Sequence, residues 1–338
     1  MSEFKVNTIT NRDGSYGPQV CGITTFGSSG MQLPSGPTEF RGGRGRGVFF
    51  GGDPADPGNM TSVDIATKGD GSDFGNLANN LSNCKGCSSS TRGLIMGGGT
   101  PSIQSGIQAV TISSTGGVFD FGDLTEARND TQAVANNVRG ISAGGNNPAK
   151  QTGIEFVTIE SAGGGTGFGD LTVKRSMGGG SGDATRGIIM GGGSGTNPAS
   201  GEEKSIDFIT IATLGDAQEF GELANEARTR TANFSNSTRA VVAGGYVDPS
   251  PGDTSHIDFV TIQTKSNAID FGDLSGNKEG MGGASSETRG LFAGGTGVTN
   301  TIDFITIATT GAAADFGDMI TGRKNFGGFS DSHGGLAQ

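Results

Sequence analysis

The chain has 338 residues, a net charge of −11 and 65 glycines, and it contains no tryptophan. This length suits one large all-β domain or two average domains, and the acidic balance argues against nucleic acid as the main partner. No apolar run approaches the roughly 20 residues that span a bilayer, and the start MSEFKVNTIT has neither the basic region nor the apolar core of a signal peptide. We therefore expect synthesis in a cytoplasm and no membrane insertion.

The first segment in chain order is residues 1–36. Its stretch FKVNTIT (4–10) is similar to a stretch near the other end of the chain, IDFITIAT (302–309). Phe26 and Gly27 follow it, as a Phe-Gly pair follows the later stretch, although eight more residues intervene. Residues 1–36 are thus expected either to add strands to the repeat that follows them or to form an extended arm.

Residues 37–338 consist of copies of one repeat, which aligns on a recurring Phe-Gly pair. Successive pairs are about 45 to 52 residues apart, a period typical of propeller blades. The phenylalanines are Phe74, Phe121, Phe168, Phe220, Phe271 and Phe316. The copies are bounded at about 37–80, 81–128, 129–175, 176–228, 229–278 and 279–323, with closing strands in 324–338.

Each copy divides into four extended pieces, of which the last complete copy is an example. A stretch of small polar residues (GGASSET) is followed by an apolar run that ends in paired glycines (RGLFAGG), then by IDFITIAT, and finally by DFGD. Ile, Val, Thr and Phe favour strands, whereas Gly and Asp interrupt them. No segment has a sustained 3.6-residue apolar period. The pattern predicts an all-β propeller of four-stranded blades with almost no helix.

The end of the chain decides how many blades the ring contains. Residues HGGLA (333–337) fall where the apolar strand of another copy would begin. We predict a seventh blade that combines strands from 324–338 with strands from 1–36, because a closed ring leaves no inner or lateral edge open to aggregation. The alternative is a ring of six blades with residues 1–36 as an arm.

The repeat carries side chains that we interpret as structural anchors. Each Phe-Gly phenylalanine is expected to fill the gap between blades, with the glycine making room for it. An arginine follows the phenylalanine by 18 or 19 residues, at Arg92, Arg139, Arg186, Arg239 and Arg289, and counting back gives Arg46. Recurring acids are interpreted as turn residues and partners of these arginines, rather than as cation ligands: Asp120, Asp123, Asp170, Asp270, Asp273, Asp315 and Asp318.

The repeat varies most between its second and third strands, in segments 53–59, 100–106, 146–153, 194–205, 246–256 and 296–301. Loops of variable length on a rigid scaffold are where binding usually lies. The two longest segments supply the candidate binding residues Asn197, Glu202, Tyr246, Asp248, Asp253 and His256. The alternative is that loop length drifts here without functional consequence.

Residues with the pattern of a catalytic, cofactor or metal site do not stand out. The chain has two histidines and two tyrosines, and its glycine strings lack the G-x-x-x-x-G-K-[ST] pattern of a phosphate-binding loop. Cys84 and Cys87 are predicted to lie on a loop between two blades, and they do not supply the four ligands of a structural zinc site. We therefore expect no enzymatic activity and no bound cofactor or metal.

The order of these elements resembles the kelch repeat: an arginine, a small polar strand, an apolar strand ending in GG, a third strand and an aromatic residue. Phenylalanine stands here where that family usually has tryptophan, and Gly and Thr are unusually frequent. The resemblance covers about residues 37–338 and implies a fold rather than a function. The Tyr, His and Trp constellation of the copper oxidase among kelch-like proteins has no matching positions in this chain.

The first residues carry a second resemblance. FKVNTITNRDGSYGPQVCGITTF (4–26) is similar to the start of virion proteins of tailed bacteriophages, particularly of marine and cyanobacterial hosts, where KVNTITNRDG introduces tail-fibre and other appendage proteins. The repeat sequences TRGLFAGG, IDFITIATTG and DFGDL also resemble those of structural proteins in such phages.

These similarities imply a non-enzymatic virion protein, made in the host cytoplasm. It would be an adaptor or appendage on the tail, baseplate, neck or capsid, in multiple copies per particle. Its partners would be other virion proteins, and a host-surface glycan or receptor if the protein also takes part in host recognition. The alternative is a kelch-type protein- or glycan-binding module outside a virion, and a propeller enzyme is a remote third reading.

Overall fold

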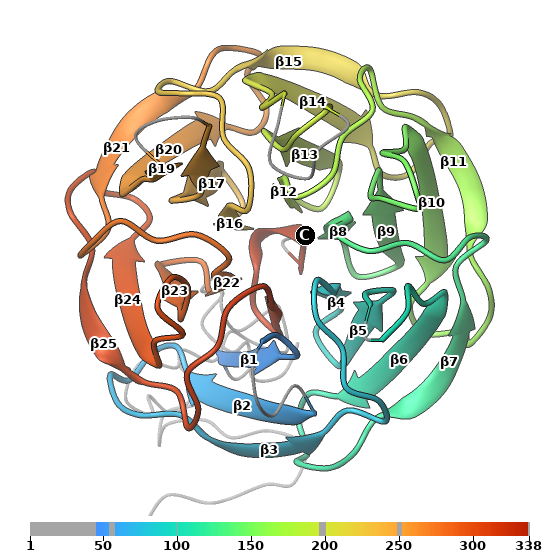
Figure 1. Ribbon diagram of the computed structural model, residues 1–338, viewed down its shortest axis with the longest axis horizontal. Helices are drawn as coiled ribbons and strands as arrows, with labels where there is room; N and C mark the ends of the chain where they lie inside the picture. Colours follow the sequence, from blue (N-terminus) through green and yellow to red (C-terminus); the bar gives the residue numbers. More distant parts are fainter. Residues whose placement is uncertain (1–44, 54–57, 100, 196–200, 249–251, 337–338) are drawn as a thin grey trace, which may run out of the picture.

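The computed structural model describes residues 45–53, 58–99, 101–195, 201–248 and 252–336. Within these residues, six four-stranded antiparallel sheets stand around a central axis as the blades of a propeller (Figure 1). The described residues contain no α-helix, so the prediction of an all-β propeller with four-stranded blades is confirmed.

The strands of each blade are given from the axis outward. Blade 1 contains β26 (Gly327–Ser330), β1 (Arg46–Phe50), β2 (Asn59–Asp64) and β3 (Ser72–Asn76). Blade 2 contains β4 (Lys85–Ser88), β5 (Arg92–Met96), β6 (Gly106–Thr111) and β7 (Phe119–Asp123). Blade 3 contains β8 (Gln132–Ala135), β9 (Arg139–Ala143), β10 (Gly153–Thr158) and β11 (Thr166–Asp170). Blade 4 contains β12 (Gly179–Gly182), β13 (Arg186–Met190), β14 (Ser205–Thr210) and β15 (Gln218–Glu222). Blade 5 contains β16 (Ala232–Ser235), β17 (Arg239–Ala243), β20 (His256–Thr261) and β21 (Ile269–Asp273). Blade 6 contains β22 (Gly282–Ser285), β23 (Arg289–Ala293), β24 (Thr301–Thr306) and β25 (Ala314–Asp318).

The two ends of the repeat region meet in blade 1. β26 pairs antiparallel with β1, with Gly47 opposite Ser330 and Phe50 opposite Gly327. The prediction of a seventh blade is therefore wrong, and the six-bladed alternative is right. The closing residues supply the inner strand that blade 1 lacks instead of starting a further blade. Segment 1–36, predicted to share in closure or to form an arm, lies outside the described residues.

Residues 333–336, predicted to begin an apolar strand, also fold differently. Gly334–Leu336 form a short 3-10 helix, η2, beside the axis. A Cβ on Gly334 would lie 2.1 Å from the Asn236 carbonyl oxygen, and one on Gly335 would lie 1.9 Å from that of Ala135. Because β26 already completes blade 1, the chain turns against the inner strands of other blades and has no sheet left to join.

The hydrophobic core lies between the blades rather than within any one of them. In the part of the chain that the structure describes, buried apolar residues form six clusters, and each cluster is shared by two neighbouring blades. Phe74 of blade 1, for example, is buried with Val110 and Ile112 of blade 2. In blades 3 to 6 the Phe-Gly ring also packs edge-on against a third-strand phenylalanine, as Phe168 does against Phe156. Each blade therefore depends on both of its neighbours to bury its two faces.

The glycine after each phenylalanine makes room for a neighbour's backbone rather than for the ring. A Cβ on Gly75 would lie 2.2 Å from the carbonyl oxygen of Gly116, in the turn between the third and fourth strands of blade 2. The same turn donates a hydrogen bond from the Gly116 N–H to the Phe74 carbonyl (2.8 Å). The contact also closes the ring, because Gly69 of blade 1 donates in the same way to the Phe316 carbonyl of blade 6 (3.1 Å).

Each of the six repeated arginines links its own blade to the next. Arg46 donates to the Ile112 carbonyl (2.8 Å), and Arg289 of blade 6 donates to the Ile65 carbonyl of blade 1 (2.8 Å). The other four bonds run from Arg92, Arg139, Arg186 and Arg239 to Ile159, Ile211, Ile262 and Ile307. Each guanidinium also lies over a phenylalanine of its own blade, 4.3 to 6.0 Å from the ring centroid. The predicted pairing with the recurring aspartates is wrong, since a peptide carbonyl and an aromatic face hold these arginines.

A second series of cations, absent from the sequence-based predictions, lies seven or eight residues after the Phe-Gly phenylalanine. These junction cations are Arg128, Arg175, Arg228, Lys278 and Arg323, and the first copy has Leu81 instead. Four of them pair, at 2.9 to 3.3 Å, with an acid in the third strand of the next blade: Glu155, Asp207, Asp258 and Asp303 in chain order. Blade 2 has Gln108 at the position of the acid, so Leu81 and Gln108 remove both charges together.

Removing the inner strand of blade 1 should open the ring. A chain that ends at Phe326 lacks β26 and with it the buried Phe329. Loss of a buried phenylalanine alone costs about 3–5 kcal/mol, and each kcal/mol moves the Tm of a large domain by about 2 °C. We expect a Tm about 10 °C below that of a chain ending at Ser330, which keeps all six blades complete. Circular dichroism melts of the two truncations measure this, and equal melting temperatures would contradict closure by β26.

Breaking one junction pair should cost more than replacing both of its members. Arg175→Leu leaves Asp207 buried without its cation, and both side chains are fully buried in the native protein. We expect the free energy of unfolding to fall by about 3–5 kcal/mol. Adding Asp207→Gln reproduces the Leu81–Gln108 combination and should restore most of the loss. Urea unfolding of the wild type, both single variants and the double variant measures the coupling, and additive losses would show that the pair is not coupled.

Candidate functional site

The segments between the second and third strands all emerge at one end of the propeller, because every blade has the same strand order and direction. We call this end the loop face. Parts of its segments lie outside the described residues, at 54–57, 100, 196–200 and 249–251. In blade 5 the segment forms a small hairpin of β18 (Tyr246–Val247) and β19 (Gly252–Asp253). The loop face thus combines a fixed frame with segments that differ from blade to blade.

The polar residues predicted to bind a partner brace neighbouring loops against one another. Glu202 Oε1 accepts the Asp248 N–H (3.0 Å), which ties the loop of blade 4 to that of blade 5. Asp253 accepts a hydrogen bond from the Thr296 hydroxyl of blade 6 (2.5 Å). Asn197, also predicted to bind, lies outside the described residues. These two hydrogen bonds therefore connect the loop of blade 5 to the loops of blades 4 and 6.

Tyr246 and His256, the other two predicted residues, make local contacts. Tyr246 exchanges two backbone hydrogen bonds with Thr229 (2.8 and 3.0 Å), and it is half-buried. His256 begins β20, and its Nδ1 lies 2.8 Å from Oε2 of Glu226. Burial opposes ionisation of Glu226, but hydrogen bonds from its own N–H and from His256 bring its pKa below the ordinary value. The first contact fixes the hairpin of blade 5, and the second the start of β20, to the linker that precedes blade 5.

At the centre of the loop face, a closed ring of backbone hydrogen bonds surrounds the axis. Its members are Asn83, Asp130, Met177, Arg230, Gly280 and Asn325, all with a φ between 53° and 66°. Each N–H donates to the carbonyl of the preceding member, and Asn83 closes the ring on Asn325, with distances of 2.6 to 2.9 Å. Asn, Asp and Gly tolerate this left-handed conformation best. One of these three residue types stands nine residues after the Phe-Gly phenylalanine in four of the six copies, and this recurrence is the signal by which the central ring could have been predicted.

Charged side chains gather around the central ring, at the mouth of the channel along the axis. Burial raises the pKa of Asp130 to about 6, although Lys85 and Arg230 favour its charged form. Burial also lowers the pKa of Lys85, which lines the channel, and Asp130 opposes that change. Arg230 is held by Glu279, with Nη1 at 2.9 and 3.0 Å from the two carboxylate oxygens. The mouth therefore contains both signs of charge and one acid that the fold holds against ionisation.

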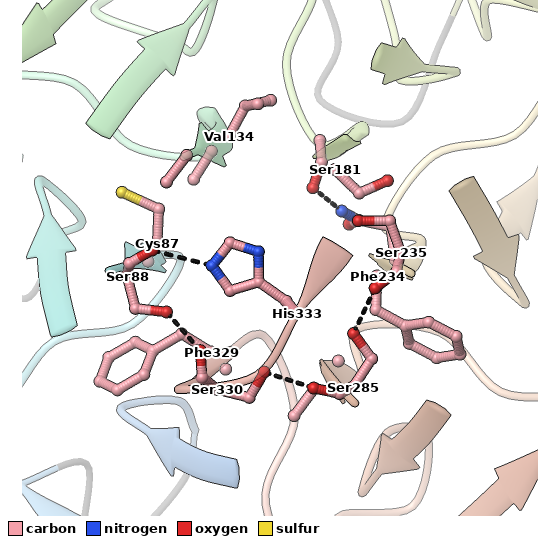
Figure 2. Close-up of a pocket in the computed structure, with 18 of the residues that line it drawn as sticks. Cys87, Ser88, Val134, Ser181, Phe234, Ser235, Ser285, Phe329, Ser330 and His333 are labelled. Atoms are coloured by element: carbon pink, nitrogen blue, oxygen red, sulfur yellow. Dashed lines mark hydrogen bonds between the residues drawn. The ribbon is translucent and has the colours of Figure 1, made fainter. Parts of the chain in front are cut away.

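Below the mouth, the channel is narrow and lined by small residues. Ser88, Ser330, Ser285 and Ser235 form a belt in which each hydroxyl donates to a carbonyl of the adjacent inner strand, at 2.5 to 2.7 Å (Figure 2). The belt is interrupted in blades 3 and 4, where Ala135 and Gly182 stand at the serine position. The cavity has a volume of about 50 Å³. That is room for a few waters, whereas small-molecule sites measure roughly 300 Å³ or more.

His333 occupies the interruption of the belt and closes the channel at the end opposite the loop face (Figure 2). Its Nε2 lies 2.8 Å from the Ser88 carbonyl, the acceptor that a serine at position 135 would have used. Its Nδ1 accepts the Gly335 N–H (3.1 Å). A general base needs a ring nitrogen directed at a substrate, and both nitrogens of His333 are engaged within the chain. His333 is therefore a structural plug.

Cys84 and Cys87 do not form a shared site. Cys84 packs in the cluster between blades 1 and 2, and Cys87 packs in the cluster between blades 2 and 3, so blade 2 separates the two sulfur atoms. Their predicted position on a loop between blades is right for Cys84, which directly precedes β4, and wrong for Cys87, which lies in that strand. Burial raises the pKa of each thiol to about 12. Neither is poised to act as a thiolate.

The recurring aspartates lie in the outer strands, spread around the perimeter of the ring. Asp123, Asp170 and Asp273 each accept a hydroxyl hydrogen bond from the residue before the third strand of the same blade, at 2.7 to 2.9 Å. Among the described residues, no group of three or more His, Cys, Asp or Glu side chains is placed to hold a metal ion. These carboxylates serve the turns at the outer edge of each blade.

No protein-family model matches the chain, and no curated protein matches it either. In the part of the chain that the structure describes, no helix is long and apolar enough to cross a membrane. The geometry of the propeller and the resemblances of its sequence are therefore the basis on which a function is proposed.

Replacing Asp130 by asparagine should stabilise the protein at neutral pH. The carboxyl ionises near pH 3.8 when unfolded and near pH 6 when folded, so between these values the folded state keeps a proton that the unfolded state has lost. Stability therefore falls as the pH rises from about 4 to about 6, by on the order of 3 kcal/mol. Asparagine does not ionise, so it removes this loss of folding stability. It also adopts the φ of 55° at this position readily.

Thermal unfolding across this pH range tests the expectation. At pH 7 the Tm of Asp130→Asn should exceed that of the wild type, and the decline between about pH 4 and pH 6 should be smaller. Asp73→Asn, at an exposed position of β3, is the matched control and should leave the profile unchanged. A lower Tm for Asp130→Asn at pH 7 would mean that the ionised carboxylate stabilises the channel mouth.

Proposed function

We propose that this protein is a non-enzymatic structural and binding component of a tailed-phage virion. The observation that carries the proposal is the contrast between a frame repeated in six blades and a loop face whose segments differ from blade to blade. A rigid frame with variable loops on one side is the arrangement of a binding scaffold. Its assignment to a virion rests on the resemblance of residues 4–26 to the start of phage appendage proteins.

The frame offers a second face for docking within the particle. We call the end opposite the loop face the hairpin face, because it is formed by the turns between strands one and two and between strands three and four. Val138 and Leu214 lie in such turns of blades 3 and 4 and are 57% and 59% exposed. Single exposed apolar side chains are common on protein surfaces, but two of them in turns of adjacent blades on one face supply the start of a contact surface for another protein. We therefore assign docking to the hairpin face and recognition to the loop face.

The perimeter of the ring is unsuited to pairing with another sheet. In five of the six blades an exposed acid stands directly before the Phe-Gly phenylalanine of the outer strand: Asp73, Asp120, Glu219, Asp270 and Asp315. Charges on an edge strand discourage the addition of a further strand. Rings in a particle would therefore associate through their faces and stay apart at their edges.

A second candidate function is a kelch-type protein- or glycan-binding module that works outside a virion. The bracing of the loops of blades 4, 5 and 6 favours it, because a polar surface held in one shape loses less entropy on binding a partner. This candidate uses the same loop face. It differs from the first in where the ring is located and in what the hairpin face contacts.

Purified particles of the phage whose genome encodes the chain distinguish the two candidates. Quantitative mass spectrometry should find the protein at a fixed copy number per particle if it is a virion component. Its absence from particles that contain all other structural proteins would exclude the virion role. Its presence in the infected cell alone would favour a binding module.

Trimming the hairpin of blade 5 tests which face recognises a partner. Replacing residues 246–255 by a short glycine-serine linker should leave incorporation into particles unchanged and reduce adsorption to the host or binding to a glycan array. The matched control replaces the exposed Val138 and Leu214 of the hairpin face by serine, which leaves the contacts between blades in place, and should reduce incorporation instead. The reverse pattern would show that the loop face docks and the hairpin face recognises.

A further inference from the structure

One junction between blades departs from the others. Five linkers carry a junction cation, but the linker between blades 1 and 2 carries Leu81. The backbone there is the same, since the Gly52 N–H donates to the Leu81 carbonyl (2.8 Å) as the Gly98 N–H donates to that of Arg128 (3.0 Å). The junctions therefore differ in their side chains and can be compared atom by atom.

The backbone acceptors that hold a junction arginine are preserved at this junction. Between blades 2 and 3, Arg128 Nη1 donates to the carbonyls of Gly144 and Gly153 (both 3.1 Å). Two further junctions repeat this pair of contacts, made by Arg175 and Arg323. Between blades 1 and 2 the equivalent carbonyls belong to Gly97 and Gly106. Gly97 N–H donates to the Gly106 carbonyl (3.1 Å), as Gly144 does to Gly153 (3.0 Å), so the acceptors have the same arrangement.

The space that the guanidinium fills elsewhere is open at this junction. A Cβ built on Gly153 would lie 3.8 Å from the Arg128 guanidinium, whereas a Cβ built on Gly106 would meet no heavy atom within 4 Å. A pocket of about 170 Å³ lies between blades 1 and 2, the blue and teal blades of Figure 1. Leu81 and Ile107, both almost fully buried, contribute its apolar lining.

The rest of the lining suits a cation. Asp120, an exposed carboxylate of β7, also lines the pocket. Its counterpart in blade 5 is Asp270, which favours the charged form of the junction cation Arg228. A carboxylate at this position of the outer strand therefore acts on a charge held in the junction.

Gln108 keeps the polar support of the junction while removing the inner negative charge. Its Oε1 accepts the Ala78 N–H (2.9 Å), as Oε2 of Glu155 accepts the Thr125 N–H at the next junction (2.7 Å). The amide thus preserves the linker geometry without a carboxylate that would be left unpaired beside Leu81. The junction remains folded with its arginine position vacant.

We propose that the pocket between blades 1 and 2 binds a guanidinium group supplied from outside the chain, either a small free cation or the arginine side chain of a partner protein. The group would donate to the carbonyl of Gly106, which lines the pocket, and, as Arg128 does at the next junction, to that of the first paired glycine, Gly97, with Asp120 as counter-ion and the apolar stem against Leu81. A planar guanidinium with five N–H donors fits two carbonyls and a carboxylate better than a compact ammonium does. The site lies at the loop-face end of β6, and the inference stands whether or not the chain belongs to a virion.

Titration of the ¹⁵N-labelled full chain with methylguanidinium chloride tests the proposal by NMR. We expect saturable shifts of the Gly97, Gly98 and Gly106 amides, and no such shifts with methylurea, a neutral molecule of similar shape, or with sodium chloride at equal ionic strength. Nα-acetyl-arginine N-methylamide in a parallel titration represents a partner's side chain. Saturation by this probe identifies a protein partner as a possible source, and saturation by methylguanidinium alone identifies a small cation. No saturation by either, or equal shifts with methylurea, would overturn the proposal.

Variants place the binding in this pocket. Leu81→Arg with Gln108→Glu fills the vacancy with the pair found at the next junction, and should weaken binding at least tenfold. Asp120→Asn changes an exposed side chain, so it should keep the fold and weaken binding several-fold. Arg175→Leu with Asp207→Gln recreates the vacancy between blades 3 and 4 and should add a second saturable set of shifts at Gly191 and Ser205. Unchanged affinity in a folded Leu81→Arg, Gln108→Glu variant or in Asp120→Asn would place the binding elsewhere and contradict the proposal.

Discussion

Closure of the ring is the constraint on which the rest of this structure depends. No blade buries its apolar faces alone, because every hydrophobic cluster is shared between two neighbours. The contacts made between successive blades are therefore also made between blade 6 and blade 1: Arg289 donates to the Ile65 carbonyl, Gly69 to the Phe316 carbonyl and Asn325 to the Gly280 carbonyl. The pairing of β26 with β1 makes this possible, since it completes blade 1 from two distant parts of the chain.

The residues that repeat build the frame, so specific interactions are expected where the repeat changes. Two changes show different outcomes. At Ala135 the serine belt loses a hydroxyl, and His333 of the C-terminal segment takes the carbonyl that the hydroxyl would have used. At Leu81 the junction loses its cation, and a pocket remains that the described residues leave open. At Ala135 the chain itself supplies the missing hydrogen-bond partner, His333. At Leu81 the backbone carbonyls stay available to a cation from outside the chain.

Much of the frame could be predicted from the sequence, because six copies report the same strand pattern. The four strands of each blade, the burial of the Phe-Gly phenylalanines and the position of the variable loops all follow from aligning the copies. The number of blades does not follow from it, because the GGFS of β26 has the pattern of an inner strand and fits either the start of a seventh blade or the completion of blade 1, whose other strands begin at Arg46. The partners of the repeated arginines were also missed. A carbonyl such as that of Ile112 leaves no trace in a sequence, whereas a nearby aspartate is an obvious but wrong partner. The residues of the central ring and the junction cations recur at nearly constant distances from the phenylalanine, so aligning the copies would have identified them. Their contacts, however, are known only from the structure.

Hydrogen exchange measured by mass spectrometry tests the central claim, that a six-bladed ring is closed by β26. If it is, peptides that contain β26 should exchange as slowly as those of the inner strands β4 and β8, and they should lose protection together with β1 as denaturant is added. Rapid exchange of β26, at the rate of exposed turns, while β1, β2 and β3 stay protected would show that blade 1 holds without it, and the account of closure would be wrong.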